Sequence, residues 1–315
     1  MNILAFKQEL PDAMLDAFKR FGLVTYGSCT NEINSGANMN SSSNKEPFQS
    51  LPITSDLTTA YALSLVVAFL MTAVSIGGLL FPPVIYPTEE LRQSYLANDV
   101  VNLLVGLPIL LGSMWLSRRG KLIGLLCWPG ALLYTFYNYI AYVFGIPFSW
   151  FTLGFVLLVF LSAYPVFALL KNVDRDALKI QLTGSVSEKL SGGALVFFGL
   201  AFFFLAVSVI TGAGADQTTS MTDVSVAIAD IVLSMLLFVG GILLFRRHPL
   251  GYANGLGLLF ATNTLFIGVI LIVLFQPLLT DAPFVLEDVM VLSAMALISF
   301  IPTGLFVRGV LSKGE

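Results

Sequence analysis

Eight long stretches of apolar residues dominate this sequence and decide what it can fold into. Each is close to the about 20 residues that a helix needs to cross the hydrocarbon core of a bilayer. Only 11% of the residues are charged and 57% are hydrophobic, so a soluble fold would leave much apolar surface in water. The sequence therefore predicts an all-α, polytopic membrane helical bundle. The eight predicted transmembrane helices cover residues 57–81, 98–117, 121–145, 148–170, 192–212, 225–245, 250–276 and 287–309.

The sign of the charge alternates between successive loops. SRRGK (117–121) and FRRHP (245–249) are basic, whereas YPTEELRQ (86–93) and TDAPFVLED (280–288) are acidic. If the chain crosses eight times, every Lys and Arg except Arg92 falls on the side of the two termini. Because basic loops stay in the cytoplasm, we expect a protein of the cell (cytoplasmic) membrane with both termini cytoplasmic.

A polar leader, residues 1–56, precedes the first apolar stretch. Apolar residues at helical spacing over 3–22 predict an amphipathic helix that lies on the inner leaflet. The Ser/Asn-rich stretch over 30–50 is typical of a disordered cytoplasmic linker. An alternative stays open at this point: Met39 is the natural start, and residues 1–38 lie outside the natural protein.

The apolar helices divide into two predicted four-helix transmembrane units. The first covers 57–175 and the second 192–309, with a cytoplasmic linker over 176–191 and a cytoplasmic tail over 310–315. Corresponding helices in the two units carry similar sequences at their basic ends, which raises the question of a duplication.

Two pairs of segments match in the same order. GSMWLSRRG (112–120) matches GGILLFRRH (240–248) at an offset of 128, and SAYPVFALLK (162–171) matches SFIPTGLFVR (299–308) at an offset of 137. These matches predict a tandem parallel repeat of four plus four helices, with the halves related by an axis along the membrane normal. The alternative is that membrane helices resemble one another and commonly end in Arg.

Pro165 and Pro302 align in this predicted duplication. Each removes a helical hydrogen bond and predicts a kink. Paired interruptions in corresponding helices point toward a central site in transporters. We favour the simpler explanation that proline is common in membrane helices.

The stretch LLYTFYNYIAYVFG places polar side chains inside a predicted transmembrane helix. At 100° per residue, Tyr134, Asn138 and Tyr142 lie one above another, and Tyr137 and Tyr139 flank them. We interpret Tyr139 and Tyr142 as members of an interfacial aromatic belt. Tyr134 and Asn138 lie deeper, where an unpaired hydroxyl or amide is unfavourable. This face should therefore point into the bundle, and hydrogen bonding between helices is its simplest role.

Carboxylates and amides on two other helices are the expected partners of this face. ANDVVN places Asp99 and Asn102 on one helix face, and TDVSVAIADIVLS places Asp223, Asp230 and Ser234 on one stripe. Asp230 lies about 10 Å inside the apolar zone, so its carboxylate must be paired, hydrated or protonated. Asp99 has a plainer interpretation as a residue of an N-terminal helical turn, where the helix dipole favours negative charge. The predicted intramembrane polar site consists of Asp99, Asn102, Tyr134, Asn138, Asp230 and Ser234.

Motifs for catalysis, cofactors or metals do not occur in the sequence. It lacks GxxxxGK[ST], HExxH and GxSxG patterns. Its one histidine is His248, and its two cysteines, Cys29 and Cys127, lie far apart, so we expect no metal, no cofactor and no disulfide framework. No nucleic-acid partner is expected either. Five basic residues are candidate contacts for anionic lipid head groups of the bilayer: Arg118, Arg119, Lys121, Arg246 and Arg247.

One segment resembles a known group of sequences. PILLGSMWLSRRGKLIGLLCWPGALLYTFYNYIAYVFGIPF (108–148) carries W-L-x-R-R-G, then L-L-Y, then Y-N-Y. This run is similar to a core that recurs in uncharacterised prokaryotic multi-pass membrane proteins. The resemblance covers about forty residues, and it implies a bacterial or archaeal integral membrane protein without implying an activity.

Three functions are compatible with these observations. The predicted function is that of a small-solute or cation transporter or channel component, with its polar site between the two halves and cations concentrated by the acidic outer loops. The alternative is a non-transporting sensor, assembly factor or accessory subunit that binds a membrane protein partner. A membrane-embedded enzyme is a third option, because carboxylates and tyrosines are available for acid–base work. A cavity that reaches Asp230 favours transport, and a dry, packed core favours the accessory role.

Overall fold

The structure, a computed structural model, describes residues 51–216 and 220–312. The predicted amphipathic helix over 3–22 and the predicted linker over 30–50 lie outside the described residues. All described residues belong to one unit of the chain, Gln49–Glu315.

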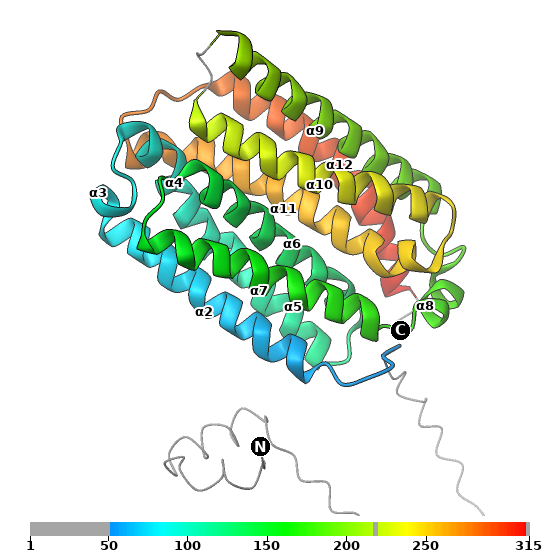
Figure 1. Cartoon of the computed structure of the whole chain (residues 1–315). Helices are drawn as coiled ribbons and strands as arrows, with labels where there is room; N and C mark the ends of the chain where they lie inside the picture. Colours follow the sequence, from blue (N-terminus) through cyan, green and yellow to red (C-terminus); the bar gives the residue numbers. More distant parts are fainter. Residues whose placement is uncertain (1–50, 217–219, 313–315) are drawn as a thin grey trace, which may run out of the picture. The chain divides into compact units, whose positions relative to one another are not determined.

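Regular structure in the described residues is helical, apart from an isolated bridge between Ile53 and Val173. The all-α prediction is therefore confirmed for this part of the chain. The elements, labelled in Figure 1, are α2 (Thr58–Leu80), α3 (Pro82–Ile85), α4 (Glu89–Val101), the π-helical turn η2 (Asn102–Gly106), α5 (Leu107–Arg118), α6 (Leu122–Gly145), α7 (Trp150–Asn172), α8 (Arg175–Leu182), α9 (Glu188–Asp216), α10 (Met221–Phe245), α11 (Pro249–Leu279) and α12 (Leu286–Leu311).

Seven helices of the described residues are long and apolar enough to cross a membrane. They are α2, the continuous helix formed by α4, η2 and α5, and then α7, α9, α10, α11 and α12. Each overlaps one of the predicted transmembrane stretches, so the prediction of a multi-pass helical membrane protein is confirmed.

Helix α6 coincides with the predicted span over 121–145 and is 24 residues long. It is not among the seven helices above, and it carries Tyr134, Tyr137, Asn138, Tyr139 and Tyr142. It packs against α5, α7, α10 and α11, and 19 of its residues are buried. The polar side chains of α6 therefore face the neighbouring helices, which explains how a helix with so many of them can lie inside the bundle. That α6 is an eighth crossing stays a prediction.

The helix connections gather at two ends of the bundle (Figure 1). At one end, the acidic end, the charged residues include Glu89, Glu90, Asp223, Asp281 and Glu287. At the other, the basic end, they include Arg118, Arg119, Lys121, Arg246 and Arg247. At the basic end, the predicted linker over 176–191 contains α8 and the start of α9.

The turn between α5 and α6 has the same backbone conformation as the turn between α10 and α11. Gly120 and Arg247 each have positive φ, 73° and 55°. The residue after each donates its amide to a carbonyl five residues earlier, Lys121 to Leu116 at 3.0 Å and His248 to Leu243 at 2.8 Å. In this hydrogen-bond pattern Gly120 takes the position of Arg247, an offset of 127, whereas the sequence match aligned the two arginine doublets at 128. The duplication itself stays a prediction.

Pro165 and Pro302 lie inside α7 and α12, and both are buried. Both helices continue through their prolines, because other hydrogen bonds and packing hold the two halves of each helix together. The Ser191 hydroxyl donates to the Pro302 carbonyl at 3.3 Å, which ties α9 to α12. The predicted kinks stay a prediction.

Two glycines allow α6 and α11 to touch. A Cβ atom added to Gly130 would collide with the carbonyl oxygen of Gly257, and one added to Gly257 would lie 3.1 Å from the Leu126 carbonyl oxygen. Small residues are typical of such close crossings between membrane helices. Helices α6 and α11 are therefore in backbone contact at this crossing.

Candidate functional site

Asp99 in α4 is the most deeply buried carboxylate of the candidate site, at 0% exposed. Its Oδ2 accepts a hydrogen bond from the Tyr86 hydroxyl at 2.6 Å, and its Oδ1 accepts one from the Tyr142 hydroxyl at 3.0 Å. Helix α2 also approaches Asp99 closely, because a Cβ on Gly78 would collide with Oδ2. Burial raises the pKa of Tyr86 well above its ordinary value, and the Asp99 carboxylate raises it further. The Tyr86 hydroxyl therefore keeps its proton at neutral pH and is the donor of its hydrogen bond to Asp99.

The prediction that Asp99 occupies an N-terminal helical turn is wrong. The helix begins at Glu89, so Asp99 lies ten residues, or about 15 Å, further along it. Glu89 and Glu90 occupy the first turn instead. The Thr88 side chain caps this helix by accepting from the Leu91 amide at 3.3 Å. The motif of Thr followed by two Glu residues is a helix-start signal that could have placed this boundary.

The interpretation of Tyr139 and Tyr142 as an interfacial belt is also wrong. Both side chains are fully buried, with ring centroids 5.2 Å apart. Tyr95, which the sequence reasoning missed, packs against Tyr142 with a centroid distance of 4.6 Å. Its hydroxyl lies 3.1 Å from the Ser225 hydroxyl of α10 and donates to the Ala141 carbonyl. The tyrosines therefore form a packed aromatic cluster inside the bundle.

Amide side chains join α6 to the helix that carries Asp99. Asn98 donates to the Asn138 side chain at 3.3 Å, and Asn138 donates to the Tyr134 carbonyl at 3.1 Å. The Tyr134 hydroxyl donates to Asn102 at 3.4 Å. Asn102 begins the π-helical turn, a feature that is frequent at functional sites. The turn ends at Gly106, where a Cβ would lie 2.9 Å from the Tyr134 ring.

Asp230 in α10 belongs to a second part of the site. Its Oδ1 accepts a hydrogen bond from the Tyr137 hydroxyl of α6 at 2.8 Å. It lies nine residues, or about 14 Å, from the start of α10. It also lines a pocket of about 380 Å³ between α9 and α10. The other lining residues are Leu205, Ala206, Ser208, Val209, Gly212, Asp223, Val226 and Ala227.

Ser234 is not brought to either part of the site. Its hydroxyl donates to the Ile231 carbonyl of its own helix at 2.8 Å. Its carbonyl oxygen lies where α10 passes close to Gly199 of α9. The predicted single site is thus two groups that contact different residues of α6. One contains Asp99, Asn102, Tyr134 and Asn138, and the other contains Asp230.

The candidate lipid contacts have protein partners at the basic end. The Arg119 guanidinium lies 3.7 Å from the centroid of the Trp115 ring, and that of Arg118 lies 5.9 Å from the Tyr61 ring. Lys121 precedes the first residue of α6. Arg118, Arg119 and Lys121 are exposed, which is compatible with contact to anionic lipid. That contact stays a prediction.

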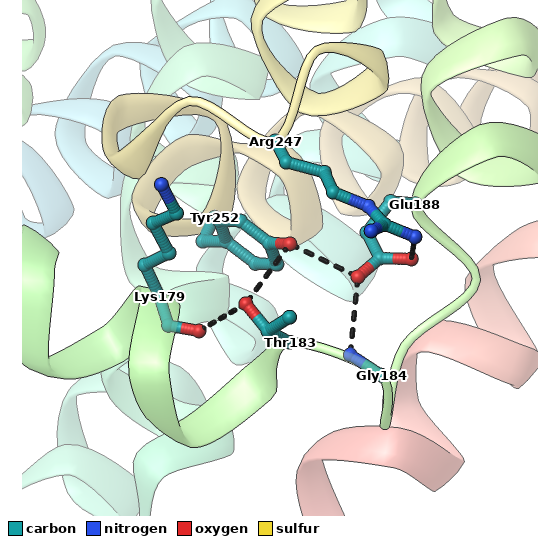
Figure 2. Close-up of polar contacts among 6 residues, drawn as sticks. All are labelled: Lys179, Thr183, Gly184, Glu188, Arg247 and Tyr252. Carbon is teal, nitrogen blue, oxygen red and sulfur yellow. Dashed lines mark hydrogen bonds and ion pairs between the residues drawn. The ribbon is translucent and has the colours of Figure 1, made fainter.

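Arg247 takes part in a polar cluster that the sequence reasoning missed (Figure 2). It lies 3.8 Å from Glu188, a buried carboxylate at the start of α9. Glu188 accepts from the Tyr252 hydroxyl at 2.9 Å and from the Gly184 amide at 3.2 Å. The Thr183 hydroxyl lies 3.3 Å from that of Tyr252. This cluster joins the connection before α9 to the turn before α11, so its geometry indicates a structural role.

His, Cys, Asp and Glu side chains do not gather into a candidate metal site in the described residues. No group of three or more of them there could hold a metal ion, and Cys127 is a free, buried thiol. No family model, curated protein or solved structure matches this chain. The resemblance of residues 108–148 to a prokaryotic membrane protein family stays a prediction.

Proposed function

We propose that this chain is a small-cation transporter or channel component of a prokaryotic cell membrane. The observation that carries the proposal is the position of Asp230. Its carboxylate lines a pocket at the acidic half of α10 and is bound on its other side by Tyr137 of the central helix. An ionisable group inside an apolar helix is unfavourable unless it has a function or a partner. The Asp230 carboxylate is accessible from the pocket and is held in place by its hydrogen bond from Tyr137.

The charges around this pocket favour a cation. Asp223 and Asp230 are the charged residues that line it, and the connections at the same end of the bundle are acidic. A cleft with one sign of charge and apolar walls raises the local concentration of ions of the opposite sign. Anionic substrates would be repelled from the same position.

The transport proposal includes eight crossings, with both termini in the cytoplasm. The burial and length of α6 support an eighth crossing, since a helix whose polar side chains face other helices can lie in a bilayer. Lys and Arg residues gather at the basic end, which supports a cytoplasmic position for that end.

The proposed duplication has support at the basic end and at the centre. The turns around Gly120 and Arg247 share their backbone hydrogen bonds. Helices α6 and α11, which correspond in the proposed duplication, meet each other at Gly130 and Gly257. A pair of corresponding helices that meets near the middle of the bundle is expected when the two halves are related by an axis along the membrane normal.

The experiment is cation flux into proteoliposomes that contain the purified chain. Wild-type protein should carry radioactive Na⁺ or Rb⁺ faster than empty liposomes. Asp230→Asn should lower that flux by about tenfold or more, because a neutral amide lacks the Coulomb attraction of the carboxylate. Asp288→Asn, an exposed acidic residue on α12, is the matched control and should keep wild-type flux. Equal flux in wild-type and empty liposomes for both ions contradicts the proposal.

A second function is favoured by one observation, the tight packing around Asp99. Tyr86, Tyr95, Tyr139 and Tyr142 are fully or almost fully buried, as expected of a non-transporting accessory subunit with a dry core. Such a subunit should co-purify from its native membrane with a stoichiometric membrane protein partner in mild detergent. Purification as a lone chain that transports cations excludes this alternative.

A further inference from the structure

We propose that the cluster around Asp99 is a binding site for one Na⁺ ion. The ligands would be oxygen atoms of Asp99, Ser75, Tyr86, Tyr139 and Tyr142. This inference rests on the proposed transport of small cations and names the ion and the buried position where it is held.

The first argument is the uncompensated charge. Asp99 is fully buried, and its hydrogen-bond partners are the neutral hydroxyls of Tyr86 and Tyr142. None of the ion pairs found in the described residues includes Asp99. A buried carboxylate without a positive partner is unfavourable by several kcal/mol, roughly. A cation bound beside Asp99 would remove this penalty.

The second argument is a pair of buried oxygen atoms whose hydrogen bonding is incomplete. The hydroxyls of Ser75 and Tyr139 make no hydrogen bond of good geometry, and both residues are 0% exposed. The Ser75 hydroxyl lies close to the Asp99 carboxylate and to the Tyr139 hydroxyl, and Tyr139 is near enough to Asp99 to be affected by its charge. Buried polar groups almost always have a partner, so each exception requires an explanation. A cation beside Asp99 would give both oxygens a partner at once.

The chemistry of these atoms selects the ion. All five side chains offer oxygen, which is the ligand that hard cations prefer. One carboxylate with four neutral hydroxyls balances a single positive charge and lacks the several carboxylates that divalent sites commonly use. The close approach of α2 at Gly78 leaves little room around Asp99, which favours a small ion. Na⁺ meets these three conditions.

The position of the cluster agrees with a route from the acidic end. Tyr86 lies in the short connection between α3 and α4, and it closes the cluster on that side. Tyr95 links the cluster to α10 through Ser225, which is on the same helix as Asp230. The Na⁺ site is therefore connected to the helix that carries Asp230.

The test is Na⁺ binding to the full chain in detergent, measured with radioactive Na⁺ in equilibrium dialysis and by thermal unfolding. Choline replaces Na⁺ at constant pH and ionic strength. Wild-type protein should bind one Na⁺ per chain and unfold at a higher temperature in Na⁺ than in choline. An unfolding temperature that does not depend on Na⁺, together with no saturable binding, overturns the proposal.

Variants of the two unpartnered hydroxyls separate binding from folding. Tyr139→Phe and Ser75→Ala each remove an oxygen that makes no hydrogen bond of good geometry, so stability in choline should change little. The affinity for Na⁺ should drop by about tenfold or more in each. Ser299→Ala removes another buried, unpartnered serine hydroxyl, on α12, and Tyr164→Phe removes an exposed tyrosine hydroxyl. Both controls should keep wild-type affinity, and wild-type affinity in Tyr139→Phe and Ser75→Ala as well overturns the site.

The two proposals fail in different ways. If Na⁺ binds and the hydroxyl variants weaken binding, but no cation enters proteoliposomes, the transport function fails and the site stands. If Na⁺ flux is present and Tyr139→Phe leaves its dependence on Na⁺ concentration unchanged, the site fails and the transport function stands.

Discussion

The Tyr137 hydroxyl of α6 donates a 2.8 Å hydrogen bond to the Asp230 carboxylate of α10. These residues lie 93 positions apart in the chain, and each belongs to a different half of the helix order. The bond fixes the depth at which the carboxylate meets the pocket, so it connects the packing of the bundle with the proposed function.

We expect Tyr137→Phe to destabilise the protein by about 1–3 kcal/mol, because a hydrogen bond to a mostly buried carboxylate is lost. Thermal unfolding in detergent measures this effect. Tyr164→Phe, at an exposed tyrosine, should change stability by less than about 0.5 kcal/mol. If both variants unfold at the same temperature, the bond between Tyr137 and Asp230 contributes nothing to stability.

Gly78→Ala should destabilise the protein by about 1–3 kcal/mol through overpacking. Its Cβ would collide with Asp99 Oδ2 and lie 2.7 Å from the Tyr86 hydroxyl. The same change at Gly112, where a Cβ would meet nothing within 4 Å, should be neutral or stabilising, because alanine favours a helix by about 1 kcal/mol over glycine. Unfolding curves of the two variants provide the comparison. A Gly78→Ala variant at least as stable as Gly112→Ala would contradict the close approach of α2 to Asp99.

Labelling of introduced cysteines tests whether α6 crosses the membrane. Lys121 and Phe148 are exposed residues that flank α6. In intact cells that express a variant without the natural cysteines, a membrane-impermeant thiol reagent should modify Phe148→Cys. Lys121→Cys should be modified only after the membrane is permeabilised. If the same side labels both, α6 does not cross and the chain has an odd number of spans.

Glu188→Ala should destabilise the protein by about 2–3 kcal/mol, since the Tyr252 hydroxyl and the Gly184 amide lose their acceptor. Cation flux per folded molecule should not change, because Glu188 lies at the basic end, away from Asp230. The control is Glu287→Ala, an exposed acidic residue in the first turn of α12. A flux defect in Glu188→Ala that exceeds its loss of folded protein would assign this cluster a role beyond structure.

The helical membrane architecture was predictable because the backbone in a bilayer must pair within each segment. Asp99 was assigned to the wrong environment because the start of its helix is polar, and hydropathy alone cannot detect a polar helix. The first turn of α4 is charged, and Glu89 forms an ion pair there with Arg92 at 3.2 Å.

The orientation of the tyrosines could be predicted only in part. The spacing of Tyr134 and Asn138 correctly predicted a face that points into the bundle, since depth alone requires partners for them. Tyr139 and Tyr142 lie where either an aromatic belt or a protein contact is acceptable. Which one applies depends on whether other helices surround α6, and a single sequence does not contain that information.

The meeting of Gly130 with Gly257 limits where anything could permeate. At that level the main chains of α6 and α11 are in contact, and no side chain lies between them that could swing aside to make way. If the chain carries an ion, as proposed, the path of that ion cannot run between α6 and α11 at this level, and it must lie along another face of α6.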